Sequence, residues 1–189
     1  NTAVGEHSGL STTTGHNNTF IGQDAGESNT TGDYNVALGS DALDSNTTAD
    51  NNTAVGYAAL AANTTGTQNT AVGTNALIAN TTAAYNVSVG YDSMKANTTG
   101  NQNVAVGRLS LSANTTGVSN VALGNHALNS STTASNNTAV GYQALYTNVD
   151  GARNTAVGSK ALYTQEPASA VDMYNTAVGY NAGNAVTTG

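Results

Sequence analysis

The chain repeats itself every 17 residues, and this period constrains its fold more than any other feature. The pentapeptide Asn–(Thr/Val)–Xaa–aliphatic–Gly occurs eleven times in 189 residues, at spacings of 17 residues nine times and of 21 residues once. A fixed period of this kind is typical of architectures in which each unit packs only against its neighbours. We therefore expect a single repeat array over 1–189, with a loop insertion at about 163–174. The eleven units begin at Asn1, Asn18, Asn35, Asn52, Asn69, Asn86, Asn103, Asn120, Asn137, Asn154 and Asn175. Because the array opens on a repeat position and stops before the last unit closes, we expect it to be a segment of a longer fibre.

Each position of the repeat has its own residue preference, as the unit at 52–68, NTAVGYAALAANTTGTQ, illustrates. Position 1 is always Asn, position 5 always Gly and position 8 always Ala or Ser, whereas position 9 is Leu or Met except in the three units that carry Gly9, Gly26 and Gly183. A glycine near the middle of each unit would break a helix, and no 3.6-residue stripe is present. The pattern predicts two short strands per unit, at positions 1–5 and about 8–14. The predicted fold is all-β: a parallel β-roll, or β-solenoid, of eleven coils and roughly 50 Å in length.

The invariant asparagine has a structural interpretation. Stacked asparagines in parallel arrays bond to one another from layer to layer. We therefore expect an Asn ladder along position 1, formed by the eleven asparagines that open the units.

Two apolar faces are predicted for the first strand, because adjacent strand residues point to opposite sides. Position 3 is small and position 4 is always Val, Ile or Leu. We expect the Ala side to fill a narrow coil and the position-4 column to pack against other chains in a symmetric oligomer. The alternative places Val and Leu inside a wider single-chain coil and leaves Ala outside. The predicted inter-chain core consists of Val4, Ile21, Leu38, Val55, Val72, Val89, Val106, Leu123, Val140, Val157 and Val178.

The NTAVG and NVALG pentapeptides with small residues at fixed offsets resemble repeats in the head domains of YadA-like trimeric autotransporter adhesins. They are also similar to the NTAVGYxAL and NTTG arrays of phage tail-fibre proteins. The resemblance covers the whole chain and implies a left-handed parallel β-roll of three chains, with the aliphatic residue before Gly on the threefold axis. In that family the rods bind, or present parts that bind, a host surface. The repeat here is longer than the usual adhesin head repeat, and no neck, stalk or anchor is present.

Few residues suggest chemistry. Eleven acidic and four basic residues give a net charge of −7, which disfavours nucleic acid as a partner, and no apolar run is long enough for membrane insertion. The three histidines, His7, His16 and His126, lack the local spacing of metal ligands, and no nucleophile or phosphate-binding motif occurs. We expect no enzyme activity, no cofactor and no metal, although calcium between coils is conceivable at Asp24, Asp33, Asp41, Asp44 and Asp50.

The recurrent Asn-Thr-Thr at positions 12–14 has three interpretations. Asn and Thr favour turns and stack in hydrogen-bonded ladders, which is the interpretation that we favour. The second is an ice-binding array formed by the Asn and the second Thr, such as Asn63 and Thr65. The third is N-glycosylation, because Asn-Thr-Thr is a formal acceptor sequence.

Nine tyrosines and one loop are the remaining candidates for recognition. Tyrosine offers a stacking surface with a polar tip, although packing along the rod would also explain these residues. The insertion carries the only proline, so we expect it to bulge from the rod. The predicted ligand surface is Tyr57, Tyr91, Tyr142, Tyr180, Glu166 and Pro167.

These features together predict a non-enzymatic, extracellular, cell-surface or virion fibre segment. It would be a rigid homotrimeric rod that spaces or presents a part binding a host-surface protein or glycan. The alternative function is a single-chain β-solenoid that binds ice or carbohydrate through its Asn-Thr-Thr or Tyr face.

Overall fold

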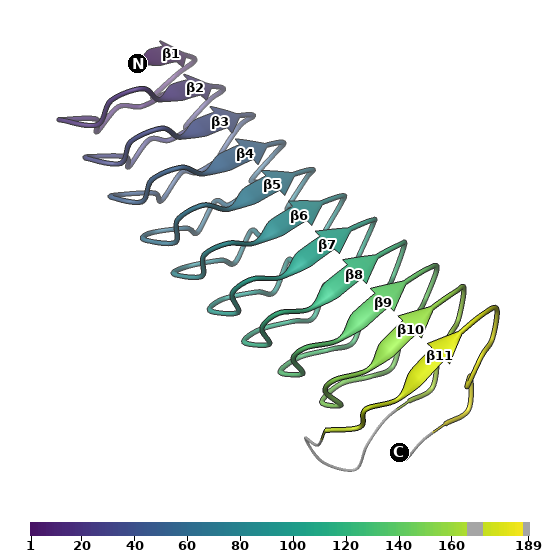
Figure 1. Cartoon of the computed structure of the whole chain (residues 1–189). Coiled ribbons are helices and arrows are strands. Elements are labelled where there is room, and N and C mark those ends of the chain that lie inside the picture. Colours follow the sequence, from purple (N-terminus) through teal and green to yellow (C-terminus); the bar gives the residue numbers. More distant parts are fainter. Residues whose placement is uncertain (166–171, 187–189) are drawn as a thin grey trace.

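The chain winds into one solenoid with a single parallel sheet along its length (Figure 1). The computed structural model describes residues 1–165 and 172–186. Its eleven strands lie in sequence order within the sheet, and each pairs in parallel with the next, which confirms the all-β solenoid. The strands are β1 (Thr2–Val4), β2 (Thr19–Ile21), β3 (Val36–Leu38), β4 (Thr53–Val55), β5 (Thr70–Val72), β6 (Val87–Val89), β7 (Val104–Val106), β8 (Val121–Leu123), β9 (Thr138–Val140), β10 (Thr155–Val157) and β11 (Thr176–Val178).

The sheet register equals the sequence period. Thr53 pairs with Thr70, and Val55 with Val72, so each repeat position lies directly over the same position of the next unit. We number the units as coils 1 to 11 and residues within them by repeat position. This register turns every repeat position into a column that runs along the rod.

The second predicted strand, at positions 8–14, is wrong: this side of each coil consists of turns. Positions 7 and 9 have positive φ, as at Ala58 (52°) and Leu60 (53°), which takes the backbone out of the β region. The coil still bonds to its neighbour here, because the backbone N–H of Leu60 donates to the carbonyl of Ala76 at 3.0 Å. The non-strand side is therefore as tightly stacked as the sheet.

The core is thin and lies inside the coils. Ala54 of β4 is fully buried, as are Ala59 at position 8 and Leu60 at position 9. These three columns form one continuous hydrophobic cluster along the rod. The narrow interior of the solenoid therefore follows from small residues at positions 3 and 8, with one larger side chain per coil at position 9.

Glycine at position 5 is required by the spacing between coils. Gly90 has φ of +132°, and a Cβ there would lie 2.6 Å from the carbonyl oxygen of Gly107 in the next coil. A side chain at this corner would both strain the backbone and clash with backbone that cannot move away.

Two buried asparagines hold the opposite corner of each coil. In coil 4, the Nδ2 groups of Asn52 (position 1) and Asn63 (position 12) both donate to the carbonyl of Gly66 at position 15, each at 2.9 Å. The Oδ1 of Asn52 then accepts the backbone N–H of Asn69 in the next coil at 3.0 Å. The expected position-1 ladder is therefore present, but the amide bonds mainly to backbone rather than to the next amide.

The position-12 column is a second ladder, and it has one gap. Asn114 donates to Oδ1 of Asn97 at 2.7 Å, and the same bond recurs from coil to coil back to Asn29. In coil 8 the position is occupied by Ser131, whose short side chain reaches neither neighbour. Oδ1 of Asn114 and Oγ of Ser131 are buried without a hydrogen-bond partner as a result.

Phe20 explains the glycines at position 9 of the first two coils. It replaces the usual Ala at position 3, and its ring is 1% exposed. A Cβ at Gly26 would lie 2.6 Å from the Phe20 ring, and one at Gly9 would lie 2.9 Å from it. The single ring therefore fills the space that leucines occupy in the other coils.

This complementarity predicts a rescue by compensating substitutions. Phe20→Ala should destabilise the first coils by about 3–5 kcal/mol, because it leaves a cavity between two glycines. Adding Gly9→Leu and Gly26→Leu should recover most of the loss by restoring the Ala–Leu pattern of the central coils. Urea unfolding followed by circular dichroism measures both steps. Equal stability of the single and triple variants would contradict this packing account.

Candidate functional site

The outward side of the sheet is the largest uniform surface on the rod. Because Asn at position 1 and Ala at position 3 point inward, positions 2 and 4 point outward on every strand. We call this surface the sheet face. Position 2 is Thr or Val, so the face is a strip of β-branched and aliphatic side chains.

The predicted inter-chain core lies on this face. Leu38 is 42% and Val106 39% exposed in the single chain, whereas Val72 is half-buried between its neighbours. The alternative packing, with Val inside and Ala outside, is wrong, since Ala71 and Ala105 on the same strands are fully buried. Leu at position 9 is inside, as that alternative had it, but on the turn side. An apolar strip of this length on a soluble chain is typical of an interaction surface.

Tyrosines line both margins of the sheet face. Tyr57, Tyr91 and Tyr142 follow the corner glycine and are 56%, 51% and 47% exposed. Tyr34 and Tyr85 precede the invariant Asn on the other margin and are 59% and 57% exposed. Of the rest of the predicted ligand surface, Tyr180 is 75% exposed in coil 11, and Glu166 and Pro167 lie outside the described residues.

The two tyrosines at position 10 behave differently. Tyr146 and Tyr163 are half-buried and stack with ring centroids 5.2 Å apart and planes at 4°. His126 meets Tyr146 edge-on at 5.9 Å. Packing along the rod therefore accounts for these two tyrosines.

The Asn-Thr-Thr segments do not form the array that ice binding would need. Asn63 is fully buried and its amide is used inside the coil, so the proposed pair of outward columns from Asn63 and Thr65 is wrong. Thr64 is half-buried, with its Oγ1 donating to the carbonyl of Thr81 at 3.1 Å. Thr65 is exposed and belongs to a single outward Thr column at position 14. The buried amide also leaves no access for glycosylation of Asn63 in the folded chain.

The insertion returns to the rod through a charged contact. Arg153 Nε lies 2.9 Å from Asp172 Oδ1, and the backbone N–H of Met173 donates to the carbonyl of Ala152 at 3.0 Å. The bulge that the sequence predicts at 166–171 lies outside the described residues.

Charge is concentrated at one end of the rod. Residues 1–51 hold seven of the eleven acidic residues and no Lys or Arg, while 52–189 hold the remaining four acidic and all four basic residues. The net charges of the two parts are therefore −7 and 0. The acidic residues of the first part are Glu6, Asp24, Glu27, Asp33, Asp41, Asp44 and Asp50.

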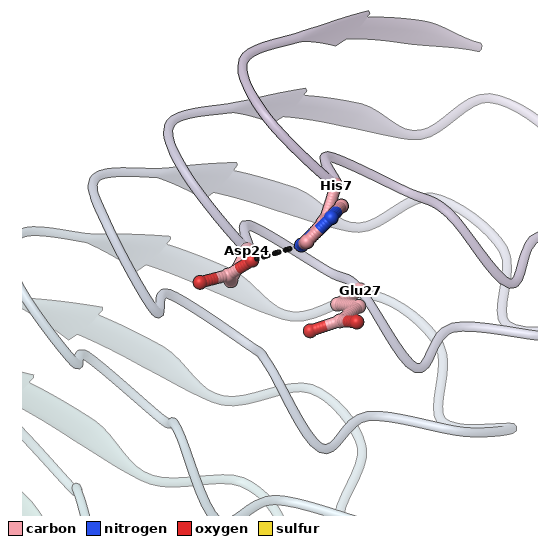
Figure 2. Close-up of side chains that lie close together, drawn as sticks. All are labelled: His7, Asp24 and Glu27. Carbon is pink, nitrogen blue, oxygen red and sulfur yellow. Dashed lines mark hydrogen bonds and ion pairs between the residues drawn. The ribbon is translucent and has the colours of Figure 1, made fainter.

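Three of the side chains at this end converge, as Figure 2 shows. Nδ1 of His7 lies 3.0 Å from Oδ1 of Asp24, and Glu27 lies beside them, with one candidate ligand atom of each residue within 4.8 Å of the others. We call these residues the His7 cluster. The sequence analysis missed it because it sought ligands a few residues apart, whereas His7 and Asp24 are one full period apart. Reading positions 7 and 10 down the columns would have found it.

The remaining acidic residues predicted as a calcium site divide into two columns. Asp24, Asp41 and Asp44 occupy positions 7 and 10 near the cluster, whereas Asp33 and Asp50 occupy position 16. The Oδ1 of Asp50 accepts the backbone N–H of Asp33 at 2.7 Å, which gives that column a structural role. Burial raises the pKa of Asp44, and the carboxylates of Glu27, Asp41 and Asp24 raise it further.

The other shifted histidine lies far from this cluster. Burial lowers the pKa of His126, and Arg108, whose guanidinium is 3.2 Å from Nε2, lowers it further. Nδ1 of His126 is buried without a hydrogen-bond partner. A proton on this ring would therefore add an unpaired charge beside an existing cation.

Comparison with known proteins found no match of this chain to a family model, to a curated protein or to a solved structure. Among the described residues, no helix has the length and apolar character needed to cross a membrane.

The lowered pKa of His126 predicts a pH effect on stability. The unfolded histidine ionises near pH 6.5, above its folded pKa, so stability should fall as pH drops through 6.5 toward the folded value. His126→Gln should remove this contribution, since Gln143 occupies the same position in the next coil. Thermal melts at pH 7 and pH 5 should show the variant losing about 1 °C less than the wild type. An equal loss in both proteins would contradict the assignment.

Proposed function

We propose that this chain is a non-enzymatic segment of an extracellular or virion fibre, in which three copies associate through their sheet faces. The observation that carries the proposal is the unbroken outward column of Val, Ile and Leu at position 4, half-exposed along the whole sheet. Covering the remaining exposed surface would contribute roughly 1 kcal/mol per coil per chain. Summed over eleven coils, this is enough to hold the rod together as an oligomer.

The resemblance to trimeric adhesin heads and phage tail fibres supports three chains rather than two. Parallel, in-register coils make a rod whose stiffness comes from hydrogen bonds at every step along its axis. Such a rod suits spacing: it would hold a binding part away from the surface that carries it. A left-handed winding belongs to the same proposal.

Recognition by the rod itself is a second candidate, favoured by the exposed tyrosines. With sheet faces joined, Tyr57, Tyr91 and Tyr142 would lie beside the junctions between chains. Their open rings suit stacking against sugars or protein side chains. The ligand would then be a host-surface glycan or protein met along the side of the rod.

The mass of the chain in solution tests the proposal. Three chains of 18.8 kDa give about 56 kDa by light scattering. Val72→Asp with Val106→Asp should reduce this mass to one chain or cause aggregation, because carboxylates would enter an apolar junction. Thr82→Asp with Thr116→Asp is the matched control: it adds the same charge to the same two coils on the exposed Thr column and should leave the mass unchanged. A stable wild-type monomer would contradict the proposal.

A further inference from the structure

The His7 cluster brings three metal-ligand groups from two coils to one point. His7 comes from coil 1, and Asp24 and Glu27 come from coil 2 (Figure 2). One nitrogen and two carboxylate oxygens lie within 4.8 Å of one another. The imidazole distinguishes this site from the solvated acidic patches that are common on protein surfaces.

The backbone beneath the cluster is fixed by hydrogen bonds. The N–H of Asp24 donates to the carbonyl of Glu6 at 2.9 Å, which joins the two coils next to His7. The N–H of Glu27 donates to the carbonyl of Asp24 at 3.2 Å, which closes the turn that carries both carboxylates. Only side-chain torsions therefore remain to be ordered when a ligand binds.

Coil 6 shows what the same two positions hold when the chain supplies its own cation. There, Asp92 occupies position 7 and Lys95 occupies position 10, and Nζ of Lys95 lies 3.1 Å from Oδ2 of Asp92. In coil 2 the corresponding residues are Asp24 and Glu27, so a second carboxylate stands where the ammonium stands in coil 6. A cation from solution would complete the coil 2 site as Lys95 completes the coil 6 site.

Backbone preference explains only part of this composition. Position 7 has positive φ, 53° at His7 and 55° at Asp24, and Asp and His are among the residues that tolerate it. Position 10 carries no such requirement, since Ala61 and Ile78 occupy it elsewhere. Glu27 therefore has no backbone reason to face Asp24.

The electrostatic environment favours a cation as well. Asp41 and Asp44 continue the two columns in the next coil, and residues 1–51 contain no Lys or Arg to offset them. The raised pKa of Asp44 reports the same crowding of carboxylates. A divalent ion would relieve repulsion across both coils.

We propose that His7, Asp24 and Glu27 bind a divalent transition-metal ion of the Zn²⁺ class. One imidazole nitrogen with two carboxylates suits Zn²⁺ and its neighbours, whereas Ca²⁺ and Mg²⁺ take oxygen ligands. Metal–ligand bonds of about 2.0–2.1 Å require ligand atoms about 3.3 Å apart, which rotation of these partly exposed side chains provides. The Nδ1 of His7 coordinates in its unprotonated form, and water completes the shell. The bound ion links coil 1 to coil 2.

Zinc titration of the tag-free chain tests the proposal. Calorimetry with ZnCl₂ should show one saturable site per chain, and His7→Ala or Glu27→Gln should raise the Kd at least about tenfold. Asp92→Asn and His16→Ala are matched controls, one at position 7 of coil 6 and one on another histidine of coil 1. Both should leave the Kd unchanged.

Because the chain has three histidines, NMR identifies the ligand directly in the wild type. Zinc should shift the imidazole resonances of His7 and leave those of His16 and His126 in place. This measurement holds even if a variant folds poorly. Absence of saturable binding, a shift of His16 instead of His7, or calcium binding that leaves His7 unshifted would each overturn the proposal. The test does not depend on the number of chains in the rod.

Discussion

Each coil depends on two buried asparagine amides that hold one carbonyl. The side chains at positions 1 and 12 approach the carbonyl of position 15 from two sides, as Asn52 and Asn63 do at Gly66. A corner this tight leaves backbone groups without strand partners inside a dry interior, where an unmade hydrogen bond costs about 1–3 kcal/mol. The asparagines satisfy these groups and, through Oδ1 at position 1, also bond to the next coil.

The orientation of the sheet follows from this clamp. With Asn52 pointing inward, alternation along the strand sends Ala54 inward and places Thr53 and Val55 outside. The interior can then be thin, because small residues at positions 3 and 8 bring the two walls of the coil together. The same geometry leaves an apolar strip on the outside along the whole rod. An interior built for stability thus creates a surface that needs a partner.

Much of this architecture could be predicted from the repeat alone. The period gave the register, invariant Gly marked the close approach of coils, and the Ala/Val alternation separated the two faces of the sheet. The turns at positions 8–14 could not be predicted, because Leu60 at positive φ contradicts its ordinary backbone preference and is held there by burial. The fit between Phe20 and Gly26 was also missed, since it pairs a rare large residue with rare absences in the same and the neighbouring coil. His7 and Asp24 escaped notice for a related reason: columns, rather than local spacing, decide which side chains meet.

The central claim is that sheet faces of several chains meet along the position-4 column. Single cysteines test it directly, because the natural chain has none. Under air oxidation, Val106→Cys should give covalent dimers on non-reducing gels, with one chain in three left unpaired if three residues surround an axis. Thr116→Cys, in the same coil but on the exposed Thr column, should stay monomeric on the gel. Cross-linking at Thr116 but not at Val106 would place the junction on another face and contradict the account.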